Sequence, residues 1–157
     1  MSQFEELLRE NKLLINKALL LDNEYWGLNK NFKDIFNGKN NLELDSNKTY
    51  IVLYQGEIEF TKLICDTAIK SGANVIFSLN DEYLATNELI VRIANQIIGQ
   101  ENLSNIIKLY NNIQEEKLFK GMQTVDEVVF IGSSFDYREV KNKIKCPCKL
   151  IKVEENE

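Results

Sequence analysis

The chain has 157 residues, a net charge of −5 at pH 7 and no histidine. Its length fits one domain with a sizeable core, and its hydrophobic (44%) and charged (27%) fractions are typical of a soluble globular protein. The acidic balance argues against a nucleic-acid partner, and the missing histidine excludes any Ser-His-Asp or Cys-His arrangement within the chain.

The N-terminal part predicts a helix followed by a connector. Over residues 1–21 the apolar side chains recur at spacings of three and four, which indicates an amphipathic helix, and Ser2 and Glu5 resemble a capping box. Residues 22–48 are rich in Asn, Lys and Asp, so we expect an irregular connector. Aromatic residues would pack this connector on the body of the chain: Tyr25, Trp26, Phe32 and Phe36.

From residue 49 onward, short apolar runs alternate with helical segments. The expected strands are 50–54, 74–78, 105–110, 127–131 and 148–153, and the expected helices are 57–71, about 81–98, 114–122 and 135–143. Gly72 and Gly99 are expected to end the first two helices, and Asn80 or Asp81 to cap the second.

This alternation predicts an α/β fold in a single domain over residues 1–157, with its core at 49–153. We expect a doubly wound, mostly parallel, five-stranded Rossmann-like sheet with helices on both faces. An N-terminal helix would precede it.

Ligands of such sheets bind beyond the carboxyl ends of the strands. The segment DEVVFIGSSFDYREV, residues 126–140, runs there from a buried strand through Gly132 into a helix. Ser133 or Ser134 would place a hydroxyl beside the amides of the helix start, which suits an anion. A serine is equally a preferred N-cap, so the segment is also consistent with a plain turn. No G-x-G-x-x-G fingerprint follows the first strand, and no P-loop is present.

The three cysteines do not predict a catalytic or metal site. Cys65 lies among apolar helical positions, where a buried thiol is expected. The pair Cys146 and Cys148 could chelate a soft metal, but a closed zinc site needs about four ligands and no second cluster supplies them. The absence of a long apolar run and the charged start of the chain predict no membrane span and no signal peptide. We therefore expect a cytoplasmic protein, and the richness in Lys, Asn and Ile suggests a bacterial one.

Residues 50–153 resemble the cofactor-binding domain of the aldehyde dehydrogenase superfamily. The segment 71–81, SGANVIFSLND, resembles the family's a-G-N-x-V-V-x-K-P-S-E segment, and residues 85–89, ATNEL, match the helix after it. Residues 125–133, VDEVVFIGS, are similar to the v-D-x-I-x-F-T-G-S motif. Residues 50–56 fall at the first strand and the nicotinamide-side loop, and residues 148–151 fall where a strand leads to the E-L-G-G segment.

The resemblance implies a set of cofactor-binding positions. Gly132 and Ser133 would face the pyrophosphate, Ser78 and Asp81 the adenosine ribose, and a loop of Tyr54, Gln55 and Gly56 the nicotinamide side. Several family residues differ here. Ser78 replaces the ribose-contacting lysine, Leu79 and Asn80 replace Pro-Ser, and the loop lacks Pro-Trp-Asn. The chain also ends where the family's catalytic domain begins, and neither Cys146 nor Cys148 lies at the position of its nucleophile.

Three functional hypotheses follow from the resemblance and these differences. The first is a non-catalytic binding or regulatory module with a degenerate nucleotide cleft, for which NAD or NADP is the candidate ligand. The second is a protein-interaction or assembly module without a small ligand, which would bind a protein partner or a second copy of the chain. The third is one half of a split aldehyde dehydrogenase-type oxidoreductase. We expect no catalytic residue, no metal site, and no nucleic-acid or membrane partner.

Overall fold

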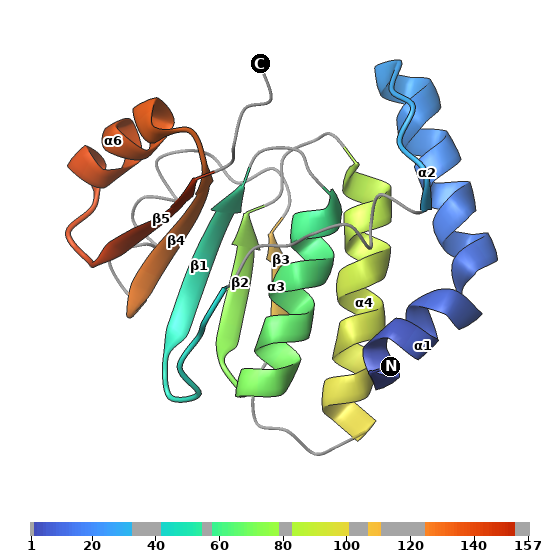
Figure 1. Ribbon diagram of the computed structural model, residues 1–157, viewed down its shortest axis with the longest axis horizontal. Coiled ribbons are helices and arrows are strands. Elements are labelled where there is room, and N and C mark those ends of the chain that lie inside the picture. The colour runs from blue at the N-terminus through green and yellow to red at the C-terminus, as the bar shows by residue number, and fades with distance from the viewer. Residues whose placement is uncertain are drawn as a thin grey trace.

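The chain folds around a parallel β-sheet with the strand order β3-β2-β1-β4-β5 (Figure 1). The computed structural model describes residues 2–32, 42–54, 58–78, 83–100, 107–110 and 125–152, and for residues 54, 78, 100, 107–110 and 152 it describes the backbone alone. The strands are β1 (Thr49–Tyr54), β2 (Asn74–Ser78), β3 (Ile107–Tyr110), β4 (Glu127–Gly132) and β5 (Cys148–Lys152). Every neighbouring pair is parallel, which confirms the predicted α/β class and parallel sheet.

The sheet is buried on both faces because apolar side chains occupy both sides of its central strands. In β1, Tyr50 and Val52 belong to a large core on one face, while Ile51 and Leu53 belong to a smaller core on the other. β4 alternates in the same way. Continuous apolar strands of this kind are typical of parallel sheets covered on both sides.

In the described part of the chain, more helices lie on one face of the sheet than on the other. The larger core lies under α3 (Ile58–Ser71) and α4 (Leu84–Gln100), which pack side by side in Figure 1. On the other face, α6 (Ser134–Lys143) packs on β4 and β5. The ring of Tyr137 lies 6.3 Å from that of Phe130, and its hydroxyl donates to the carbonyl of Cys148 at 2.8 Å. The helix predicted at 114–122 lies outside the described residues.

The N-terminal region forms two helices, where the sequence predicted one helix and a connector. These are α1 (Gln3–Glu10) and α2 (Lys12–Trp26), so residues 22–26 are helical and not part of an irregular connector. The chain bends at Asn11, which has φ −96° and ψ 16°. Both helices pack against α4, and Gly27 ends α2 with φ 66°. Phe32 packs on the large core as expected, whereas Phe36 is outside the described residues.

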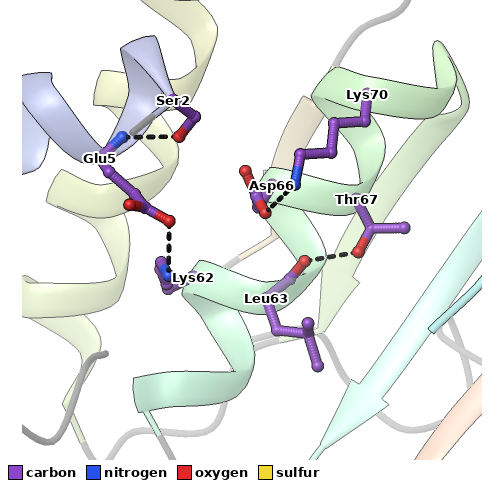
Figure 2. A network of polar contacts seen from close by, with 7 residues as sticks. All are labelled: Ser2, Glu5, Lys62, Leu63, Asp66, Thr67 and Lys70. Carbon is purple, nitrogen blue, oxygen red and sulfur yellow. Dashed lines mark hydrogen bonds and ion pairs between the residues drawn. The ribbon is translucent and has the colours of Figure 1, made fainter. Parts of the chain in front are cut away.

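Polar contacts fasten α1 to α3 and stabilise both helices (Figure 2). The Ser2 hydroxyl accepts from the amide of Glu5 at 3.1 Å, as the predicted cap requires. The Glu5 carboxylate forms an ion pair with Lys62 of α3 at 3.4 Å and so joins the two helices. Within α3, Lys70 pairs with Asp66 at 3.0 Å, one turn away.

The two glycines predicted to end helices behave differently. Gly72 follows α3 with φ 78° and its amide donates to the carbonyl of Ala68, so the predicted stop is confirmed. Gly99 lies inside α4, which continues to Gln100, so the predicted stop there is wrong. The difference arises because a glycine ends a helix only where the chain must turn with positive φ.

A buried carboxylate on α2 caps the start of α4. Asp22 is 7% exposed, and its Oδ2 accepts from the amide of Thr86 at 2.9 Å and from the Thr86 hydroxyl at 2.7 Å. Tyr83, just before α4, has φ 60°, a strained value for a bulky residue, and its hydroxyl donates to Asn23 of α2 at 3.4 Å. The caps predicted at Asn80 or Asp81 lie outside the described residues.

Within the described residues, no helix combines the length and the apolar character needed to cross a membrane.

We predict that Asp22→Ala lowers the free energy of unfolding by about 2 kcal/mol, because a buried amide and hydroxyl of Thr86 lose their acceptor. Chemical denaturation at low protein concentration measures this loss. Glu24→Ala, an exposed carboxylate on the same helix, is the control and should change stability by less than about 0.5 kcal/mol. Equal losses in the two variants would contradict the capping role.

Candidate functional site

The candidate site is the carboxyl edge of the sheet, where the arrows of β1 and β2 point upward in Figure 1. The chain order reverses between β1 and β4, so this boundary is the topological switch point at which such sheets bind ligands. The register pairs Tyr54 with Ile131 and Leu53 with both Phe130 and Ser78. Three neighbouring strands therefore end at this edge, with Tyr54, Ser78 and Gly132 as their last residues.

The structure describes part of the predicted cofactor set. It places Tyr54, Ser78, Gly132 and Ser133 at the carboxyl edge, the first two by their backbone alone. Gln55, Gly56 and Asp81 lie outside the described residues, so their predicted roles stay predictions. Gly132 is the buried last residue of β4, and Ser133 follows it as the N-cap of α6.

At the start of α6, Ser133 and Asp136 bind each other. The Ser133 hydroxyl accepts from the amide of Asp136 at 3.2 Å and donates to its Oδ2 at 3.0 Å. The amide of Tyr137 already bonds to the Ser133 carbonyl, so only the earlier amides of the turn, those of Ser134 and Phe135, point off the helix end. The serine hydroxyl expected to meet a phosphate is thus engaged within the turn.

The charge at this position is negative. Asp136 lies in the first turn of α6, where a carboxylate interacts favourably with the positive end of the helix dipole. A phosphate would seek the same amides and the same end of the dipole, and it would meet the carboxylate at short range. The turn therefore has the backbone geometry of an anion site, but its own side chain supplies the anion.

At the start of α4, too, a carboxylate of the chain itself binds a helix amide. Asp22 takes the corresponding position at α4, as described above. Between α3 and α4, the Thr61 hydroxyl donates to Oδ1 of Asn87 at 2.8 Å, and both residues are fully buried. Among the described residues, Nδ2 of Asn87 is buried without a hydrogen-bond partner. This amide is 1% exposed and joins the two helices inside the core, where solvent does not reach it.

None of the three cysteines lies at the carboxyl edge. Cys65 is fully buried in α3, and burial raises the pKa of its thiol. Cys146 precedes β5 and Cys148 begins it, so both lie at the opposite, amino edge of the sheet. Burial raises the pKa of both thiols, to about 11 for Cys148. Among the described residues there is no cluster of three side chains that could hold a metal ion.

Apart from the carboxyl edge, the structure has a pocket between α3 and residues 42–45, with a volume of about 600 Å³. Asp66 and Lys70, drawn in Figure 2, line it and pair with each other, and this contact raises the pKa of Lys70. The region adjoins the C-terminal half of α3, whose end leads into the amino edge of the sheet. It is therefore separate from the switch point.

Sequence reasoning missed the two carboxylates that close the helix starts. Asp136 follows Ser133 by three residues, a spacing typical of a reciprocal helix cap, so the sequence carried a usable signal. Asp22 had no such signal, because it acts on a helix 64 residues away. Asp126, part of the family-like motif, accepts from the amide of Thr49 at 2.7 Å and fixes β4 beside β1.

Comparison with known proteins supports the fold. No protein-family model matches the sequence, and no curated protein sequence matches it. Solved structures do match. Gamma-glutamyl phosphate reductase from Thermotoga maritima matches with a TM-score of 0.71 and 13% sequence identity. The match covers 93% of this chain and 45% of the reductase chain. Gamma-glutamyl phosphate reductase from Saccharomyces cerevisiae matches with a TM-score of 0.64 and 19% sequence identity. The match covers 92% of this chain and 48% of the reductase chain.

The chain thus shares the fold of a part of each of these two reductases. This agrees with the α/β class that the sequence predicted. The chain spans about half the length of these neighbours. At such low identity the likeness establishes the fold alone.

We predict that thiol alkylation of the native protein is slow and strongly pH-dependent. The pKa of Cys148 rises from the ordinary 9.0 to about 11, so at pH 8 its thiolate fraction should be about 100-fold below that of an exposed thiol. Mass spectrometry after iodoacetamide treatment should show Cys148 labelling increasing about tenfold per pH unit up to about pH 11, and Cys65 labelled only after unfolding. Rapid labelling of Cys148 at pH 7 would contradict this.

Proposed function

We propose that this chain is a non-catalytic binding or regulatory module built on a dehydrogenase-like cofactor domain, with a nucleotide cleft that no longer accepts a pyrophosphate at α6. The contact between Ser133 and Asp136 carries the proposal. It places a carboxylate where the resemblance expects the pyrophosphate. A phosphate on the amides of Ser134 and Phe135 would lie near the Asp136 carboxylate, and the two negative charges would repel each other, so a dinucleotide would lose its main electrostatic anchor.

The positions of the thiols support the non-catalytic part. The reaction of aldehyde dehydrogenases, as the resemblance implies, uses a nucleophilic cysteine next to the cofactor. A nucleophilic thiol must be accessible and easily ionised. Cys65 is buried, and Cys146 and Cys148 lie at the edge of the sheet opposite the cleft, with raised pKa values. The chain also has no histidine to act as a general base.

We predict that removing the carboxylate at α6 strengthens anion binding. Asp136→Asn keeps the size of the side chain and removes its charge, so inorganic pyrophosphate and NAD should bind at least about tenfold more tightly than to the unaltered chain. Isothermal titration calorimetry at constant ionic strength measures the affinities, and ligand-dependent shifts of the unfolding midpoint provide a second readout.

Glu139→Gln is the matched control, because Glu139 is exposed one turn along the same helix and its change of charge is identical. It should leave the affinities unchanged. Submillimolar binding of NAD to the unaltered chain, or equal gains in the two variants, would refute the closed pyrophosphate position.

We also predict that the purified chain shows no thiol-dependent oxidation of aldehydes with NAD or NADP. Absorbance of the reduced cofactor at saturating substrate should stay at the level of a variant that carries Cys146→Ser and Cys148→Ser. Turnover that is lost in this variant would overturn the non-catalytic assignment.

A further inference from the structure

Helix α2 exposes more apolar surface than a solvent-facing helix needs. It buries Ile15 and Leu19 against the core, yet six large apolar side chains on it are between 41% and 79% exposed. They are Leu13, Leu14, Leu20, Leu21, Tyr25 and Trp26. Only one other large apolar side chain in the described part of the chain, Phe135, is comparably exposed. Apolar surface concentrated in this way marks an interaction site.

The exposed residues form two neighbouring lines along the helix. Leu13, Lys17, Leu20 and Glu24 are spaced by four, three and four residues, which places them on one face. Leu14, Ala18, Leu21 and Tyr25 have the same spacing and form the adjacent line. The leucine pair at 20 and 21 therefore lies midway between Lys17 and Glu24.

The charges of α2 run against its own dipole. Lys12 is in the first turn and Glu24 in the last, with no acidic residue at the start and no basic residue at the end. Within the described part of the chain, neither Lys17 nor Glu24 takes part in an ion pair. Charges placed in this way are unfavourable in an isolated helix and become favourable beside an antiparallel neighbour.

We infer that α2 binds α2 of a second copy of this chain, antiparallel, about a two-fold axis between Leu20 and Leu21. This axis places Leu20 opposite the partner's Leu21 and Lys17 opposite the partner's Glu24. Each contact occurs twice, as an isologous interface requires. The centre is then apolar, and an ion pair flanks it on either side. The spacing of the leucines and the positions of the two charges therefore make this face of α2 complementary to the same face of a second copy.

The area is sufficient for a stable pair. The exposed parts of the five apolar side chains on these two lines amount to roughly 600 Å² per copy, approaching the ~800 Å² per partner of a standard interface. The partner's Leu14 comes opposite Gly27, beside Tyr25 and Trp26. These two residues line a groove of about 360 Å³ with Asp22, Leu84 and Ala85, into which an apolar side chain can pack.

Sedimentation velocity and light scattering over roughly 1–200 µM test the inference by mass action. The mass should rise from 18.2 kDa toward about 36 kDa with concentration. Leu21→Glu should weaken association by at least tenfold. Phe135→Glu, an equally exposed apolar residue on α6, is the matched control and should leave it unchanged.

A charge exchange tests the antiparallel orientation. Lys17→Glu alone places two glutamates opposite each other, and Glu24→Lys alone places two lysines opposite each other, so each should weaken association several-fold at low salt. The double variant restores opposite charges and should recover most of the affinity. A strictly monomeric protein at roughly 200 µM would overturn the inference. So would a double variant whose loss of association free energy equals the sum of the losses in the two single variants.

Discussion

The structure depends on one constraint, that β1 and β4 are apolar on both sides and must be covered on both. Tyr50 and Val52 require a layer on one face, and Ile51 and Leu53 require another on the opposite face. Parallel strands meet this requirement because each connection crosses a face of the sheet with a helix. All helices that follow the strands then begin at the same edge. The two-sided core therefore also gathers the helix starts, with their unpaired amides, at the β1–β4 boundary.

What distinguishes this chain is how those helix starts are satisfied. In the described part, α6 is capped by Ser133 and Asp136 from its own first turn, and α4 by Asp22 from α2. Both solutions use a carboxylate of the protein. At an edge that could bind a phosphate through backbone amides, carboxylates of the chain itself instead interact with the helix dipoles and satisfy some of those amides, directly or through Ser133. The carboxylates that stabilise these helix starts are thus the same groups that, as we propose, repel an anion from this edge.

The sequence predicted the strands well because each is a short apolar run bounded by polar or turn residues, as at 74–78 and 127–131. It predicted α3 and its end at Gly72 for the same local reasons. It was wrong on α2, whose leucines occur on both sides and hide the period of a surface helix. It was also wrong at Gly99, where nothing makes the chain turn. Asp22 could not be assigned, because its partner Thr86 is set by tertiary packing and not by spacing.

The backbone of Tyr83 links α2 mechanically to the carboxyl edge. Its φ of 60° is held by burial and by the hydroxyl contact with Asn23, next to the Asp22 cap. A strained backbone angle of this kind persists only while the surrounding contacts maintain it. Because Asp22 and Asn23 both lie on α2, any displacement of this helix would change both contacts at the start of α4 together. Helix α2 therefore connects its exposed apolar face to the start of α4 through Asn23 and Asp22.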